Sequence, residues 1–357
     1  MKRGPGAVTT DGRRSVLVIR LSAIGDCVMT SPAVRALRAA CPDDFVAWVV
    51  EPKSAGIVVG NPHVDEVILW DRASGGYFSP SSALSLRRTL KPYGFDIALD
   101  FHGLARSAMI SALSGARTRV VSIDSREGAS LAANHVSQVR GPDEWVVARN
   151  VALLEAIGIH SSERRTCVPV TDESAAEADR VLQAVGLHGA PLLCLHLKGS
   201  WAHKFWPLDR FARVAEHAHE RWGLASVVTG SRDDRPDAER LASMSTVRVA
   251  NLAGELSLGG SSAVVARCSA VVGPDTCTVH MSAGLGVPTV ALFGPTSPAR
   301  VAPRGSHVRV VMYEMPCHPC VRRPTCIDYD CMLRLPTEVV VRALDDLLTQ
   351  SVAGATG

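Results

Sequence analysis

The fold is indicated by one stretch near the N-terminus, SVLVIRLSAIGD, which covers residues 15–26. Its first six residues form a short apolar run rich in β-branched side chains, which is typical of a strand buried in a parallel sheet. Gly25 and Asp26 follow, and a helical pattern begins at residue 31, with Pro32 expected in the first turn. The stretch therefore predicts a strand, a tight turn and a helix, with Asp26 at the mouth of the helix.

The same alternation continues along the chain. In the first half, further strands are predicted at residues 45–50, 64–70, 95–100 and 118–123, and helices at 84–90 and 104–113. In the second half, strands are predicted at 191–197, 225–229, 270–273, 289–293 and 308–312, and helices at 208–222, 235–244, 261–267, 279–285 and 338–348. Such repetition predicts the α/β class, with two Rossmann-like parallel-sheet domains.

The chain length supports this division, because 357 residues are many for a single hydrophobic core. A polar segment at residues 161–190, with one helix at 173–185, separates the two halves. We expect an N-terminal domain over residues 1–180, a C-terminal domain over 181–335, and a closing helix and tail over 336–357.

Composition narrows the class of protein. The formal charge of +3 is small, and no dense basic face accompanies it, which argues against a nucleic-acid binder. No apolar run is long enough to span a membrane, and residues 1–14 lack the apolar core of a signal peptide. We therefore expect a cytoplasmic protein. Peripheral contact with the cytoplasmic face of the inner membrane is compatible with this location.

Motif residues follow the predicted strands, where open parallel sheets bind their ligands. Asp26 comes after the first strand, and a carboxylate at a helix start is favoured by the helix dipole. A capping role for Asp26 is an equally open interpretation. The single Gly25 is not the glycine fingerprint of a dinucleotide-binding enzyme, which argues against a nicotinamide-dependent dehydrogenase or epimerase.

The second half carries a cationic loop, HLKGSWAHKFWP, at residues 196–207. Lys198, His203 and Lys204 could hold a diphosphate there, with Lys204 acting as a point charge. An ordinary solvated loop is the alternative.

Two further motifs follow strands of the second half. In GPDTCTVHMSAG, at residues 273–284, Asp275 and Thr276 open a helix whose N-terminal amides can bind an anion. Capping of that helix by Asp275 is the structural alternative. In FGPT, at residues 293–296, a turn brings a hydroxyl close to the same place.

These motifs together resemble a known family. The segments RLSAIGD, DFHGLARSA, the loop ending in KFWP, GPDTCTVHMSAGLG and LFGPTSP occur in the order found in glycosyltransferase family 9, the ADP-heptose heptosyltransferases. The resemblance implies the GT-B architecture, with the acceptor on the N-terminal side and the nucleotide sugar on the C-terminal side. It also implies inverting transfer of L-glycero-D-manno-heptose from an ADP carrier to the lipopolysaccharide inner core, without a catalytic metal.

The resemblance also implies roles for individual residues. Asp26 would be the general base that takes the proton of the acceptor hydroxyl. The donor sugar and its diphosphate would be bound by Lys204, Asp275, Thr276, His280, Thr296 and Ser200. An acidic acceptor would be bound by Arg126 and, as a weaker candidate, Arg106.

Other functions stay open at this point. The acceptor of the same chemistry could be a protein such as an autotransporter, or a small natural product. A non-catalytic sugar-nucleotide-binding protein is a third candidate, against which the intact Asp26 and Lys204 argue. The expected partners are an ADP-sugar donor and a glycolipid or other acceptor, and an oligomer is compatible with the sequence.

Four of the ten cysteines fall within fifteen residues, at Cys317, Cys320, Cys326 and Cys331. Four thiolates at the spacing C-x2-C-x5-C-x4-C could bind a structural zinc or iron ion tetrahedrally. The cluster is similar to the iron-holding cysteine finger of family members that modify autotransporters. Reduced thiols or disulfides are the alternative, and we leave His318 out of the predicted ligand set.

Overall fold

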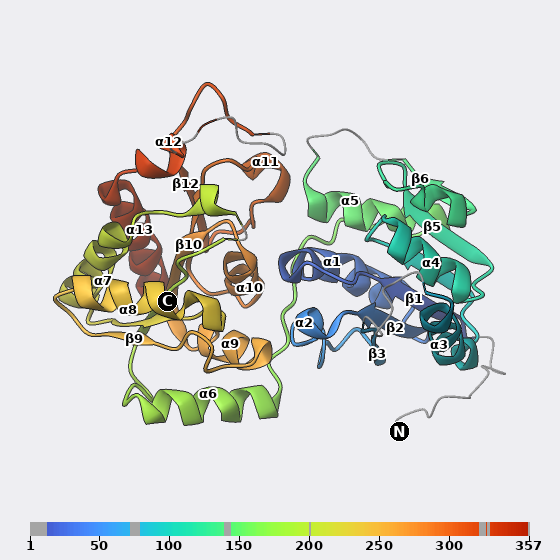
Figure 1. Cartoon of the computed structure of the whole chain (residues 1–357), viewed down its shortest axis with the longest axis horizontal. Helices are drawn as coiled ribbons and strands as arrows, with labels where there is room; N and C mark the ends of the chain where they lie inside the picture. The colour runs from blue at the N-terminus through green and yellow to red at the C-terminus, as the bar shows by residue number, and fades with distance from the viewer. Residues whose placement is uncertain are drawn as a thin grey trace. The chain divides into compact units, whose positions relative to one another are not determined.

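The computed structural model describes residues 13–71, 79–138, 144–199, 201–320, 326 and 329–355. The chain forms two compact units, Met1–Pro169 and Val170–Gly357, each of which is described by itself (Figure 1). Each unit contains one six-stranded sheet in which every pairing is parallel. The predicted α/β class with two Rossmann-like sheets is therefore confirmed.

The sheet of the N-terminal unit has the strand order β3-β2-β1-β4-β5-β6. Its strands are β1 (Ser15–Ile19), β2 (Phe45–Val50), β3 (Glu66–Leu69), β4 (Ile97–Asp100), β5 (Thr118–Ser122) and β6 (His135–Ser137). Its α-helices are α1 (Ile24–Ala40), α2 (Pro52–Ala55), α3 (Pro80–Leu90), α4 (Ala105–Leu113) and α5 (Val146–Ala152). Since the connections between parallel strands are right-handed, α1 covers one face, with α5 beside it, and α3 and α4 cover the other.

The first strand is buried along its whole length, as its apolar run predicts. It lies between β2 and β4, so both of its edges are paired in the sheet. Leu17 and Ile19 belong to the main core cluster of the unit and are fully buried. Burial of each such side chain is worth about 1.5–3 kcal/mol, so β1 anchors the loop that follows it.

The helix after β1 begins at Ile24, seven residues before the predicted start. Pro32 therefore lies inside α1 and not in its first turn, which corrects the prediction. A proline has no amide hydrogen, so the carbonyl of Val28 loses its usual helical partner. The hydroxyl of Ser31 donates to that carbonyl at 2.7 Å and replaces the missing bond. Asp26 consequently lies in the first turn of a helix.

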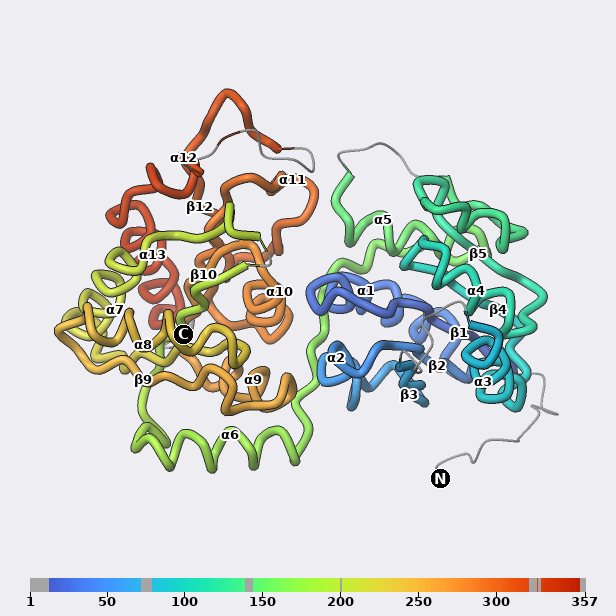
Figure 2. The backbone as a smooth tube through the Cα atoms, in the orientation of Figure 1, coloured from blue at the N-terminus to red at the C-terminus, as the bar shows by residue number. Residues whose placement is uncertain are grey.

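The sheet of the C-terminal unit has the order β12-β11-β10-β7-β8-β9. Its strands are β7 (Leu192–Leu195), β8 (Ala225–Val228), β9 (Val249–Asn251), β10 (Cys268–Pro274), β11 (Thr289–Phe293) and β12 (Val308–Met312). Its α-helices are α6 (Asp172–Ala184), α7 (Leu208–Trp222), α8 (Arg235–Met244), α9 (Leu258–Val265), α10 (Cys277–Gly284), α11 (Pro298–Val301), α12 (Asp330–Leu333) and α13 (Thr337–Ala355). Figure 2 shows α6 running beside α9, with which it packs, and the predicted boundary between residues 180 and 181 falls inside α6.

Both sheets have the same topology. Read from its other edge, the second sheet has the order β9-β8-β7-β10-β11-β12, which corresponds strand for strand to the first. The order reverses between β1 and β4 in one unit and between β7 and β10 in the other. Doubly wound sheets bind their ligands at such a switch point, at the carboxyl ends of the strands.

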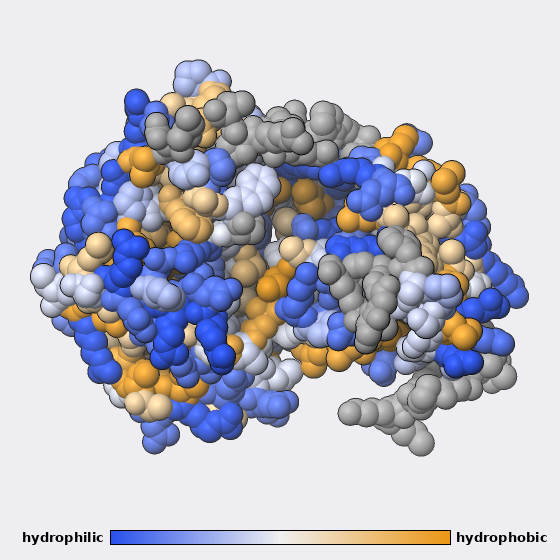
Figure 3. Space-filling view, viewed as in Figure 1, coloured by the Kyte–Doolittle hydropathy of each residue, from blue (hydrophilic) through white to orange (hydrophobic). Residues whose placement is uncertain are grey.

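The surface of each unit mixes hydrophilic and hydrophobic residues on the face that Figure 3 shows. In the part of the chain that the structure describes, no helix has the length and hydropathy needed to cross a membrane.

Candidate active site

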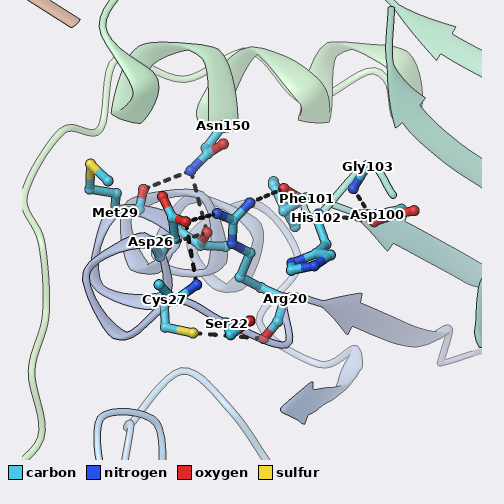
Figure 4. A network of polar contacts seen from close by, with 12 residues as sticks. Arg20, Ser22, Asp26, Cys27, Met29, Asp100, Phe101, His102, Gly103 and Asn150 are labelled. Carbon is cyan, nitrogen blue, oxygen red and sulfur yellow. Dashed lines mark hydrogen bonds and ion pairs between the residues drawn. The ribbon is translucent and has the colours of Figure 1, made fainter. Parts of the chain in front are cut away.

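Asp26 lies in the first turn of α1, close to the carboxyl end of β1 (Figure 4). Its Oδ2 accepts a hydrogen bond from the amide of Ala23 at 3.3 Å and forms an ion pair with Arg20. The guanidinium of Arg20 also donates to the carbonyl of Phe101 at 2.5 Å. The Asp26 side chain remains 36% exposed, and no described residue forms a hydrogen bond with its Oδ1. One carboxylate oxygen is therefore held in place, and the other is open to a ligand.

A second network lies at the carboxyl end of β4, the other strand of this switch point. Arg106 in α4 donates from Nε to Nε2 of His102 at 2.8 Å. It also donates to the carboxylate of Glu51 at 3.2 Å and to the hydroxyl of Ser22 at 3.1 Å. Burial and the neighbouring guanidinium groups of Arg20 and Arg106 lower the pKa of His102 to about 3. His102 is thus a neutral acceptor, and Arg106 ties it to the loop that precedes α1.

Asp100 ends β4 and organises the turn that carries His102. Its Oδ1 accepts the amides of His102 and Gly103 at 2.9 Å each, and its Oδ2 accepts the hydroxyl of Ser107 at 2.8 Å. Burial raises the pKa of Asp100 to about 6 in spite of these bonds. Gly103 has a φ of +67°, which favours glycine at this turn. The turn is therefore fixed by its own residues.

The two arginines predicted to bind an acceptor have different surroundings. Arg126 lies in the loop after β5, and its amide donates to the carbonyl of Gly103 at 2.8 Å. Its side chain is exposed, and none of the described residues forms an ion pair or a hydrogen bond with its guanidinium. Arg106 is instead engaged inside the unit. Of the two, Arg126 is the cation more open to an external anion.

In the C-terminal unit, Asp275 follows β10 at the switch point and is the centre of a buried cluster. Its Oδ2 accepts hydrogen bonds from Nζ of Lys204 and from the hydroxyl of Thr296, both at 2.8 Å. Nε2 of His280 lies 3.4 Å from its Oδ1. Burial by itself would raise the pKa of Asp275, but His280 and Lys204 together hold it well below its ordinary value. Four of the predicted donor-binding residues are thus brought together.

Lys204 and Thr276 retain unused donors beside this cluster. Lys204 directs two bonds of 2.8 Å at Asp275, one to Oδ2 and one to the main-chain carbonyl. An ammonium group has three hydrogens, so one remains for a ligand. The hydroxyl of Thr276 is buried and has no hydrogen-bond partner among the described residues, and no side chain caps the helix α10 that it precedes. A Cβ at Gly199 would lie 2.9 Å from Cδ of Lys204, so glycine permits this close approach. Together these groups place hydrogen-bond donors without partners in the described part of the chain at the start of α10.

The other residues of the cationic loop point elsewhere. Lys198 forms an ion pair with Asp237 of α8. The ring of His203 packs edge-on against Tyr329, with 4.1 Å between the ring centroids. Ser200, predicted to bind the donor, lies outside the described residues.

The four cysteines predicted to hold a metal, Cys317, Cys320, Cys326 and Cys331, are free thiols. The described residues, which include all four, contain no group of three or more His, Cys, Asp or Glu side chains that could hold a metal ion. The predicted structural iron or zinc site is therefore not supported. Burial raises the pKa of the Cys331 thiol, and the other three thiols add to this effect, but closeness of cysteines does not by itself make a metal site. Cys331 is buried against Gly294, where a Cβ would lie 3.1 Å from its Sγ, whereas Cys317 is exposed.

Three residues of the N-terminal network were not singled out from the sequence: Arg20, Glu51 and His102. Arg20 and His102 had a signal, since Arg20 directly follows β1, His102 lies two residues after the end of β4, and both belong to the family-like motifs. Glu51 follows β2 and had none, because a single acidic residue after a strand is common. These three residues come together because β2, β1 and β4 are adjacent in the sheet. Local sequence patterns do not predict this order of strands.

Known proteins resemble the chain over most of its length. Residues 83–329 match glycosyltransferase family 9 (heptosyltransferase). Lipopolysaccharide heptosyltransferase 1 of Pseudomonas aeruginosa is 29% identical over 333 residues, which cover 87% of each chain. The crystal structure of a family 9 glycosyltransferase from Veillonella parvula superposes with a TM-score of 0.83 at 22% identity, covering 94% of this chain and 97% of the other. The Escherichia coli heptosyltransferase WaaC with ADP has a TM-score of 0.73 at 22% identity, covering 93% and 99%.

The solved heptosyltransferases share the fold of two Rossmann-like parallel-sheet units, which is the GT-B architecture. The family match covers more than half of the chain. The protein belongs to glycosyltransferase family 9, the heptosyltransferase family, and is a glycosyltransferase enzyme.

Proposed function

We propose that the protein transfers a heptose from ADP-L-glycero-D-manno-heptose to a hydroxyl of the lipopolysaccharide inner core, with inversion at the anomeric carbon. The observation that carries the proposal is the state of Asp26: a carboxylate at the switch point with Oδ2 fixed and Oδ1 open. The relatives named as lipopolysaccharide heptosyltransferases support the choice of donor and acceptor.

In the proposed reaction, Asp26 is the general base. The acceptor oxygen attacks the anomeric carbon while its proton passes to Oδ1 of Asp26. The bond between that carbon and the diphosphate breaks, and ADP leaves with the electron pair. The ion pair with Arg20 and the amide of Ala23 orient the carboxylate through its other oxygen. Orientation of this kind raises the rate because the base is placed before the reaction begins.

The donor diphosphate is proposed to bind at the start of α10. The third hydrogen of Lys204, the hydroxyl of Thr276 and the free amides of the helix supply donors for its oxygens. Asp275 holds Lys204 in place, and His280 and Thr296 in turn hold Asp275. The reaction needs no catalytic metal in this scheme.

Arg126 is proposed to bind an acidic group of the acceptor, since its guanidinium is exposed in the unit that carries the base. We place the protein in the cytoplasm, in peripheral contact with the membrane where a glycolipid acceptor is found. The ten free thiols support a reducing compartment.

The replacement Asp26→Asn tests the proposal. With ADP-heptose and heptose-free lipopolysaccharide, we expect kcat to fall about 10²- to 10⁴-fold, as is usual for loss of a general base, while calorimetric ADP-heptose binding stays unchanged. Asp43→Asn is the matched control, because Asp43 is an exposed, Arg13-paired carboxylate before β2, at the opposite end of the same sheet. If Asp26→Asn transferred heptose as fast as the unaltered protein, Asp26 would not be the general base. Mass spectrometry with UDP-, GDP- and TDP-sugars, and with protein acceptors, would reveal a different donor or acceptor.

A further inference from the structure

The segment that contains the clustered cysteines packs on the turn that carries Thr296. The amide of Cys320 donates to the carbonyl of Pro295 at 2.8 Å, and Nε2 of His318 lies 2.9 Å from the carbonyl oxygen of Thr296. Because that partner can only accept, Nε2 must carry the hydrogen. A Cβ at Gly294 would lie 2.6 Å from Sδ of a methionine in α12, so the segment also contacts the turn closely from that side.

The same segment contacts the loop that carries Lys204. Trp206 is buried, and its indole nitrogen donates to the carbonyl of Leu335 at 3.0 Å. On the other side of Lys204 in the sequence, the ring of His203 rests on Tyr329. The described residues between 315 and 335 therefore touch both loops that deliver hydrogen bonds to Asp275.

These contacts converge on one carboxylate oxygen. Oδ2 of Asp275 accepts from Thr296 and from Lys204, at 2.8 Å each, and the Thr296 donor belongs to the residue whose carbonyl His318 binds. We propose that His318 is a positioning residue for the donor site. It fixes the Thr296 turn, which in turn fixes the orientation of the Asp275–Lys204 pair toward the sugar diphosphate. The inference rests on the proposed function of that pair.

This role gives the cysteine-bearing segment a function that requires no metal ion. A backbone turn of three residues has few contacts of its own, so its conformation depends on what packs on it. His318 forms a hydrogen bond with the carbonyl of Thr296 in this turn. Cys331 and Met332 of α12 fill the space beside Gly294. A donor site built from such loops loses affinity when the turn relaxes, because the hydroxyl and the ammonium group no longer point at one place.

The pair His318→Ala and His318→Gln tests the inference. The amide of glutamine can donate to the Thr296 carbonyl as Nε2 does, whereas alanine cannot. We expect His318→Ala to raise the Kd of ADP, measured by calorimetry, and the KM of the ADP-sugar about five- to tenfold, the effect of losing one hydrogen bond. His318→Gln should restore both to within about twofold. The KM of the acceptor should not change in either variant. Cys317→Ser, an exposed neighbour, is the control for a general disturbance of the segment.

Each other outcome decides against the inference. Equal ADP affinity in His318→Ala and the unaltered protein would show that the contact does not reach the donor site. Equal losses in His318→Ala and His318→Gln, or a parallel rise in the acceptor KM, would show a structural role without positioning. If the unaltered protein does not bind ADP at all, the proposed function itself fails, which the calorimetry distinguishes from a failure of the His318 role.

Discussion

Asp26 and Asp275 both lie at a switch point, but on different sides of it, since Asp26 follows β1 and Asp275 follows β10, the counterpart of β4. Each is paired with a cation. Their surroundings differ. The Asp26 side chain is 36% exposed and keeps one oxygen open, whereas Asp275 is 6% exposed and has partners on both oxygens.

The difference shows how burial separates two uses of the same side chain. A carboxylate with partners on both oxygens, such as Asp275, holds neighbouring donors in place but does not readily accept a further proton. A carboxylate held by one oxygen is oriented and still able to react. The N-terminal site is therefore the reactive one in our interpretation, and the C-terminal cluster is a rigid frame for a ligand.

The largest expected effect comes from Asp275→Ala, which leaves the nearly buried ammonium of Lys204 without its partner. Loss of one member of a buried ion pair typically costs about 3–5 kcal/mol. Asp26→Ala, at a partly exposed pair, should cost at most about 1 kcal/mol. Denaturant unfolding of both variants measures the contrast. If the two replacements reduced the free energy of unfolding equally, the distinction between frame and reactive group would be wrong.

A double replacement sharpens the first result. Lys204→Met removes the charge that Asp275→Ala leaves unpaired, so the combined variant should be more stable than Asp275→Ala alone. Such non-additivity is the sign of a direct interaction. Additive losses would mean that the pair is not coupled.

The next effect in size separates the two arginines of the N-terminal unit. Arg106→Ala removes hydrogen bonds to His102 and to the buried Glu51, and bonds to charged groups are worth about 1.5–3 kcal/mol. Arg126→Ala removes an exposed side chain and should change the free energy of unfolding by less than about 0.5 kcal/mol. If Arg126 binds an acidic acceptor, its replacement should still raise the acceptor KM. A stability loss in Arg126→Ala as large as that in Arg106→Ala would contradict the contrast.

The sequence predicted the fold because the architecture repeats a local unit. Apolar runs such as residues 15–20 are long enough to be recognised, and the motif residues follow them, as the switch-point rule requires. The edge strands β6 and β9 were not predicted, because three residues are too few to show a period. Helix α1 starts earlier than predicted because Pro32 lies inside the helix, where the Ser31 hydroxyl donates to the carbonyl that the proline leaves unpaired. Such a hydrogen bond cannot be recognised from residue spacing.

The site was predicted only in part for a related reason. Residue types and their order place Asp26 and Asp275 at strand ends, as the structure does. The sequence does not show which residues from other strands contact them. Arg20 meets Phe101 and Arg106 meets Ser22 only because β4 lies beside β1. The metal prediction shows the same limit, since close spacing of cysteines says nothing of where their side chains point.

The last predicted effect depends on pH and concerns two histidines in opposite surroundings. His280 lies beside a carboxylate, whereas His102 lies between two guanidinium groups and has a pKa lowered to about 3. In the unfolded chain a histidine titrates near pH 6.5. Between about pH 3 and pH 6.5, His102 therefore binds a proton in the unfolded state but not in the folded state. The stability that His102 contributes is complete above about pH 6.5 and falls as the pH drops toward 3, by at most about 1.4 kcal/mol per pH unit.

The replacement His102→Gln isolates this contribution, because the amide oxygen can still accept from Arg106 but cannot titrate. Acidification from pH 7 to 5 should destabilise the unaltered protein more than the variant. Asp100 works in the other direction, since its raised pKa of about 6 makes the folded state less stable as the pH rises from about 4 to 6. That term is present in both proteins, so the difference between their unfolding free energies reports His102 alone. A difference that does not change with pH would mean that His102 has the same pKa in the folded and unfolded states, and the neutral acceptor between two arginines would have to be abandoned.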